Sequence, residues 1–240
     1  MVATRSSSVA LTPGLPPTTP HRSSRASHSS AAATPPWSHT PTTLTLLWLA
    51  VSLPLVAWDT LYVLLRPHTM PGGALHWPLW VPYELYGTID HVYGWKAWNA
   101  HSGFTAAQGS LNALETAMYA AYWYLWFAGG GGAGAVEAEG GRKEKKARRA
   151  VVGRRAAWAV LIGFSAAVMT VSKTVLYWLN EYFSGFDNIG HNSAFDLVFL
   201  WIIPNGAWIV LPSYLIYQLG GEIIDGLTLA SGDSKTVKSE

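Results

Sequence analysis

Four long apolar stretches dominate the pattern of hydrophobic and polar positions along this chain. They run over residues 43–65, 104–127, 158–179 and 195–218, and polar segments separate them. A helix of about 20 residues crosses the hydrocarbon core of a bilayer. Each stretch is therefore long enough to be a transmembrane helix. The pattern predicts an all-α integral membrane protein, built as a bundle of four transmembrane helices.

Residues 1–41 form a polar N-terminal segment that is rich in Ser, Thr, Pro and Ala and has no acidic residue. A segment of this composition cannot bury enough apolar surface to fold, so we expect it to be disordered. Its arginines and serines also fit an organellar transit peptide, which stays open as an alternative. The membrane domain is then expected over residues 42–219, followed by a polar tail over residues 220–240.

The linker between the second and third stretches, residues 128–157, begins with a glycine run and ends with a cluster of lysines and arginines. Lys and Arg collect on the cytoplasmic side of membranes. The pattern therefore predicts a multi-pass protein whose linker, N-terminus and C-terminus are cytosolic. A nucleic-acid or nuclear-targeting role is the other interpretation of this cluster, but we expect no nucleic-acid partner.

The composition narrows the chemistry that this chain can perform. Its 240 residues include 13 Trp and 11 Tyr, whereas charged residues make up only 12%. Aromatic side chains at this density are typical of membrane interfaces. Cysteine is absent, which excludes disulfides and thiolate metal sites. The Walker A, HExxH and GxSxG motifs are absent as well, so we expect neither a cofactor nor a metal.

Three ionisable residues lie well inside the apolar stretches: Asp59, Glu115 and Lys173. A charged side chain at the centre of a membrane helix costs about 2.5–3.5 kcal/mol on insertion scales, so such residues are functional candidates. Residues three, four and seven positions apart share one face of a helix. By this rule each stretch carries one polar or aromatic stripe, and the four stripes contain Ser52, Asp59 and Tyr62; Gln108, Asn112, Glu115, Tyr119 and Tyr122; Thr170, Lys173, Tyr177 and Asn180; and Trp201, Asn205, Trp208 and Pro212.

Four stripes that face one another would enclose a polar intramembrane cavity with two carboxylates and one ammonium. The net charge of such a cavity is negative, and together with the aromatic faces it favours a bound cation. A protonated carboxyl group could instead donate its proton. Both interpretations fit a reaction that protonates an alkene, shelters the carbocation and removes a different proton. A non-catalytic site for a cationic ligand, and polar groups that only hold the helices together, are the alternatives.

Several segments resemble, in the same order, the emopamil-binding protein family, which includes sterol Δ8-Δ7 isomerase and the sigma-two receptor and shares the EXPERA domain. The resemblance extends over residues 46–217. It is carried by LVAWDTLYVLL at 55–65, LWVPYELYGTIDHVYG at 79–94, ALETAMYAAYWYLW at 113–126, VLYWLNEYFSGF at 175–186 and NGAWIVLP at 205–212.

The resemblance implies a four-helix EXPERA-type bundle in the endoplasmic reticulum membrane that forms a homodimer. Glu115 and Asp59 would be the catalytic acid/base pair. The partner would be a sterol-like, terpenoid or cationic amphiphilic small molecule. Asn205 would hydrogen-bond to it and Trp208 would stabilise a cation. With the stripes added, the expected substrate-binding residues are Asn205, Trp208, Asn112, Tyr119, Lys173, Tyr177 and Tyr62.

The chain departs from the family pattern at two positions near these residues. Leu55 stands where the isomerase has a histidine, and Lys173 stands where it has an acid. Both changes alter the set of groups that can carry a proton. A substrate different from that of the sterol isomerase is therefore expected.

Overall fold

The computed structural model describes residues 37–129 and 149–231. Most of the segment predicted to be disordered, residues 1–36, lies outside this part of the chain. The same is true of residues 130–148, which contain most of the basic cluster, and of the last part of the polar tail, residues 232–240.

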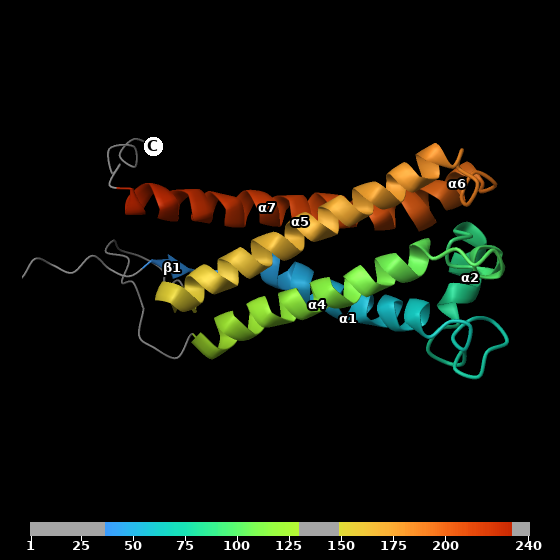
Figure 1. Ribbon diagram of the computed structural model, residues 1–240, viewed down its shortest axis with the longest axis horizontal. Helices are drawn as coiled ribbons and strands as arrows, with labels where there is room; N and C mark the ends of the chain where they lie inside the picture. Colours follow the sequence, from blue (N-terminus) through green and yellow to red (C-terminus); the bar gives the residue numbers. More distant parts are fainter. Residues whose placement is uncertain (1–36, 130–148, 232–240) are drawn as a thin grey trace, which may run out of the picture. The chain divides into compact units, whose positions relative to one another are not determined.

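Four long helices build the described part of the chain (Figure 1): α1 (Thr43–Leu64), α4 (Phe104–Gly129), α5 (Gly153–Phe183) and α7 (Ile203–Ala230). Helix α4 packs against α1 and α5, and α5 packs against α7. Close approach is possible because glycines lie at the contacts. A Cβ atom on Gly109 would meet Val63 at 2.8 Å, and one on Gly163 would meet the ring of Tyr122 at the same distance.

Three helical segments of the described residues are long and apolar enough to cross a membrane: Thr43–Leu64, Gly153–Phe183 and Ala194–Ala230. They indicate a membrane protein. The second predicted span corresponds to α4, which has 26 residues but is less apolar than these three. The polar residues of α4 lower its hydropathy. Several of them form part of the cavity wall described below.

The helices extend beyond the apolar stretches that predicted them. Helix α5 begins at Gly153 rather than at residue 158, and α7 ends at Ala230 rather than at residue 218. Apolarity marks only the part of a helix that suits a bilayer, whereas polar residues such as Arg and Glu also have high helix propensity. At the start of α1, the hydroxyl of Thr42 accepts a hydrogen bond from the Thr45 amide at 3.1 Å, which caps the helix.

A two-residue strand, β1 (Ser38–His39), pairs antiparallel with β2 (Val151–Val152). Sequence composition places β1 in the disordered segment, yet His39 is buried. Its Nδ1 lies 2.6 Å from Glu222 on α7, and its Nε2 lies 2.9 Å from the hydroxyl of Tyr122 on α4. These contacts join residues far apart in the sequence, so local composition cannot predict them.

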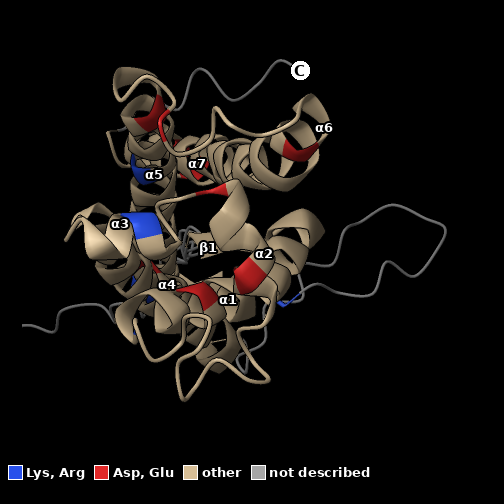
Figure 2. Cartoon of the chain, turned by 90° about the vertical axis from the view of Figure 1, so that its right-hand side faces the viewer, with Lys and Arg blue, Asp and Glu red and all other residues tan. Residues whose placement is uncertain are grey.

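Two short helices, α2 (Pro82–Ile89) and α3 (Trp95–Asn99), lie between α1 and α4 in the sequence. Figure 2 looks onto this end of the bundle, where most of the ribbon is uncharged. A second connection, through α6 (Ala194–Asp196) and the π-helix η1 (Leu197–Ile202), leads directly into α7. Single π-helical turns change the facing of the residues around them and are frequent at functional sites.

Candidate functional site

The helices enclose a cavity of about 450 Å³ near α2. Ligand pockets of proteins commonly have volumes of this order. Its walls come from α1, α2, α4, α5 and α7, together with Tyr93 of the loop after α2 and Leu200 of η1. The cavity is lined by most of the residues that the four stripes nominated: Ser52, Asp59, Gln108, Asn112, Glu115, Tyr119, Thr170, Lys173, Tyr177, Asn205 and Trp208.

Tyr62 is the exception among the expected binding residues. It does not line the cavity but is fully buried behind it, and its hydroxyl donates a hydrogen bond to the Tyr93 carbonyl at 2.9 Å. Its ring stacks on Tyr83 with the ring centroids 3.8 Å apart. Tyr62 therefore supports the loop segment that forms part of the cavity wall, and the structure places it behind this wall rather than in it.

Asp59 receives hydrogen bonds from two different helices. The hydroxyl of Tyr83 on α2 donates to its Oδ1 at 2.7 Å, and Nδ2 of Asn112 on α4 donates to its Oδ2 at 3.0 Å. Each carboxylate oxygen thus has at least one donor. Because the donors come from different elements, the orientation of the carboxyl group depends on how α1, α2 and α4 pack.

Glu115 is buried and lies opposite α5. Its Oε2 accepts hydrogen bonds from the hydroxyl of Thr170 at 2.9 Å and from Nζ of Lys173 at 3.0 Å. Its Oε1 is buried and has no hydrogen-bond partner among the described residues. The side chains of Lys173 and Glu115 are only 12% and 4% exposed, so this is an ion pair largely removed from solvent.

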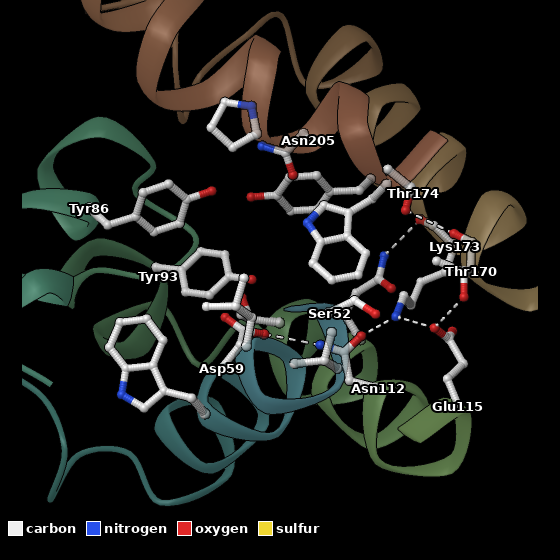
Figure 3. Close-up of a pocket in the computed structure, with 18 of the residues that line it drawn as sticks. Ser52, Asp59, Tyr86, Tyr93, Asn112, Glu115, Thr170, Lys173, Thr174 and Asn205 are labelled. Carbon is white, nitrogen blue, oxygen red and sulfur yellow. Dashed lines mark hydrogen bonds and ion pairs between the residues drawn. The ribbon is translucent and has the colours of Figure 1, made fainter. Parts of the chain in front are cut away.

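Lys173 also donates a hydrogen bond to Oδ1 of Asn112. Asn112 therefore connects both acids: its amide nitrogen binds Asp59 and its amide oxygen binds the lysine (Figure 3). We call the resulting sequence Asp59–Asn112–Lys173–Glu115 the polar chain. With both carboxylates and the lysine ionised, the polar chain carries one net negative charge.

The rest of the cavity wall is aromatic or apolar. Trp208 packs edge-on against Trp48, with ring centroids 4.7 Å apart, and this contact holds its indole at the wall. Asn205 donates from Nδ2 to the carbonyl of Trp201 in η1, four residues earlier, at 2.9 Å. Its amide nitrogen thus binds the backbone of η1. Aromatic faces beside a negative site can stabilise a positive charge.

Three tyrosines outside the long helices line the cavity, and the stripes did not include them: Tyr83, Tyr86 and Tyr93. Burial, and next to it the charge of Asp59, raises the pKa of Tyr83 well above its ordinary value. Tyr83 therefore stays protonated and donates to Asp59. The sequence has these three tyrosines within eleven residues, which could have marked them as candidate site residues. Only the path of the segment between α1 and α4 brings them against α1.

Asp90 is fully buried behind the cavity wall. It accepts hydrogen bonds from the hydroxyl of Tyr177, from Nε1 of Trp201 at 2.7 Å and from the Val92 amide at 3.1 Å. Burial raises the pKa of Asp90 to about 6, although these three donors act in the opposite direction. Its role is to hold Tyr177 in the wall and to join the loop to α5 and η1.

His91 and His191 stack face to face, with ring centroids 4.0 Å apart. Nε2 of His191 lies 2.6 Å from the Thr88 carbonyl, so the stack joins the loop after α2 to the loop before α6. Within residues 37–129 and 149–231, no group of three or more His, Asp or Glu side chains could hold a metal ion. Glu84 is exposed, near His76, and lies outside the cavity.

No family model matches this chain, and no match was found among curated proteins or among solved structures. What the cavity does must therefore follow from its own residues. It brings together two carboxyl groups, one lysine, one bridging amide and several aromatic rings. Such an arrangement can exchange protons with an apolar molecule and can stabilise a cation.

Proposed function

We propose that this chain is a membrane-embedded isomerase that moves a double bond in a sterol-like or terpenoid lipid. The observation that supports it most directly is the polar chain, in which two acids from different helices face one aromatic cavity. The fold proposed for it is an EXPERA-type bundle of four spans, with α4 as the fourth. Its proposed place is the endoplasmic reticulum membrane, with both termini cytosolic.

In the proposed reaction Asp59 is the proton donor. Its proton bonds to one alkene carbon, the π electrons form that C–H bond, and the neighbouring carbon becomes cationic. Glu115 then removes a proton from the next carbon, and that C–H electron pair becomes the new double bond. Glu115 takes the role of base in this scheme, with its Oε2 3.0 Å from the ammonium of Lys173.

After each turnover the proton has to return from Glu115 to Asp59. Lys173 and Asn112 lie between the two acids, on the direct line of hydrogen bonds. The carbocation is stabilised by the net negative charge of the polar chain and by the aromatic walls, among them Trp208, Tyr119 and Tyr177. The resemblance to the emopamil-binding protein family supports the same assignment of the two acids.

The test is expression in yeast that lacks sterol Δ8-Δ7 isomerase, with sterols profiled by mass spectrometry. Restored Δ7 sterols with the wild-type chain would show that it isomerises sterols, and Asp59→Asn and Glu115→Gln are then expected to lose this activity by about 10²–10⁴-fold. Glu84→Gln is the matched control, because this acid is exposed and outside the cavity. Correctly inserted wild-type protein that leaves Δ8 sterols unchanged would contradict sterol isomerisation.

A second candidate function is non-catalytic binding of a sterol or of a cationic amphiphile, similar to the sigma-two receptor. The Lys173–Glu115 pair favours it, because that pair neutralises Glu115 and leaves Asp59 as the one unpaired charge of the polar chain. A single ligand ammonium would complete the charge balance. Incubation in D₂O separates the two functions, since an isomerase incorporates deuterium into its lipid product and a binding protein does not.

A further inference from the structure

The proposed reaction uses the acids of the polar chain but not the nitrogen of Lys173 as a nucleophile. This lysine lies within α5 and lines the cavity. An ionisable residue inside a membrane helix is costly and is a functional candidate in its own right. An ion pair that only held α4 and α5 together would not need to lie in a cavity wall.

The surroundings of Lys173 suit chemistry at its nitrogen. An ammonium group has three hydrogens, and contacts with Glu115 and Asn112 use two of them. Oε2 of Glu115, 3.0 Å away, is placed to take a proton directly from the nitrogen. Oε1 of the same carboxylate is buried and has no hydrogen-bond partner among residues 37–129 and 149–231.

We propose that Lys173 binds an apolar aldehyde or ketone covalently, as an imine. Lysines that lie desolvated in apolar pockets are known nucleophiles toward carbonyl groups. The site goes beyond the proposed isomerase function, because it requires the cavity but neither the isomerase reaction nor a bound amine.

The step balances within the residues present. Glu115 takes a proton from the ammonium, and the freed nitrogen pair forms a bond to the carbonyl carbon, whose π electrons move to oxygen. Proton transfers within the adduct and from Glu115 convert that oxygen to water, which leaves as the nitrogen pair forms the C=N bond. The remaining proton stays on the imine nitrogen, so the positive charge of Lys173 is kept beside the carboxylate of Glu115. The mostly apolar wall favours loss of water from the adduct.

Lys96 is the matched comparison in the described part of the chain. It is also paired with an acid, Asp187, at 2.8 Å, but both side chains are well exposed, at 44% and 65%. Lys96 is thus an acid-paired lysine like Lys173, but it does not line the cavity. If solvent exposure decides which lysine reacts with the carbonyl compound, Lys96 is labelled. If binding of the apolar compound in the cavity decides it, Lys173 is labelled.

The experiment incubates the purified full chain in detergent with all-trans-retinal and reduces the imine to a stable amine with sodium borohydride. Peptide mass mapping then locates the adduct, with all-trans-retinol as the control without a carbonyl. The wild type is expected to carry the adduct at Lys173 at a yield about tenfold above that at Lys96. Lys96→Arg should carry the adduct at Lys173 to the same extent as the wild type. Lys173→Arg should lack it, and Glu115→Gln should form it about tenfold more slowly.

Adduct formation that favours Lys96, or folded wild-type protein without an adduct at Lys173, would overturn the proposal. Mapping on the wild type does not depend on how well any variant folds. Sterol profiles in the yeast test are a separate measurement, so either proposal can fail while the other stands.

Discussion

The hydroxyl of Tyr83, on the short helix α2, donates a hydrogen bond across 2.7 Å to Oδ1 of Asp59, in the second half of α1. The segment between α1 and α4 thus supplies a hydrogen-bond donor to one of the acids that line the cavity. Tyr62 stacks beneath the same ring. The position of Asp59 therefore depends on the loop as much as on the bundle.

Replacing Tyr83 by Phe is expected to lower the free energy of unfolding by about 1–3 kcal/mol, because Oδ1 of Asp59 loses its hydrogen-bond donor without a change of shape. Unfolding in detergent, followed by tryptophan fluorescence, measures it. Tyr124→Phe is the control, since Tyr124 is 70% exposed and should change stability by less than about 0.5 kcal/mol. Equal stability of the two variants would contradict a structural role for the Tyr83–Asp59 bond.

Removing one partner of the buried Lys173–Glu115 pair should be more harmful than removing both. Lys173→Met leaves Glu115 charged and unpaired, and a loss of about 3–5 kcal/mol is expected. The double variant Lys173→Met/Glu115→Gln should recover much of that loss. Lys96→Met breaks an exposed pair and should cost only about 0–1 kcal/mol. A double variant less stable than Lys173→Met alone would exclude this coupling.

Asp90 should make stability depend on pH. Its pKa is raised from 3.8 to about 6, so between these values the folded chain keeps a proton that the unfolded chain releases. The contribution of Asp90 to stability is therefore complete below about pH 4 and falls by on the order of 3 kcal/mol as the pH rises through 6. Between about pH 4 and 8, the free energy of unfolding of the wild type should fall by this amount relative to that of Asp90→Asn. Parallel curves would show that Asp90 does not titrate in this range.

Gly163 is expected to tolerate no side chain. A Cβ atom there would lie 2.8 Å from the ring of Tyr122 and 3.1 Å from Leu219, and both side chains are buried. Gly163→Val should therefore lower the free energy of unfolding by about 1–3 kcal/mol through overpacking. Gly221→Val is the matched control, since nothing lies within 4 Å of its Cβ position. Equal losses in both variants would point to helix propensity instead.

The sequence by itself determined the long helices and the inward direction of most functional side chains. Apolar length predicted where the helices lie, and the helical period placed Asp59, Glu115 and Lys173 on faces that meet at one cavity. Both signals are local, because they depend only on residues within a few turns of one another.

Only the tertiary structure decided which groups are partners. Lys173 pairs with Glu115, and Asn112 rather than the lysine contacts Asp59. The helical period predicts the direction in which a side chain points from its helix axis. These pairings also depend on how far one helix is shifted along the next. That shift follows from close contacts such as Gly109 against Val63, between residues far apart in the sequence.

Contacts between residues far apart in the sequence also explain which tyrosines line the cavity. Tyr62 shares a helix face with Asp59, yet the loop covers it, and Tyr83 enters the cavity wall in its place. No periodicity in α1 could show this, because the path of residues 66–103 is set by buried long-range contacts such as that of Asp90 with Trp201.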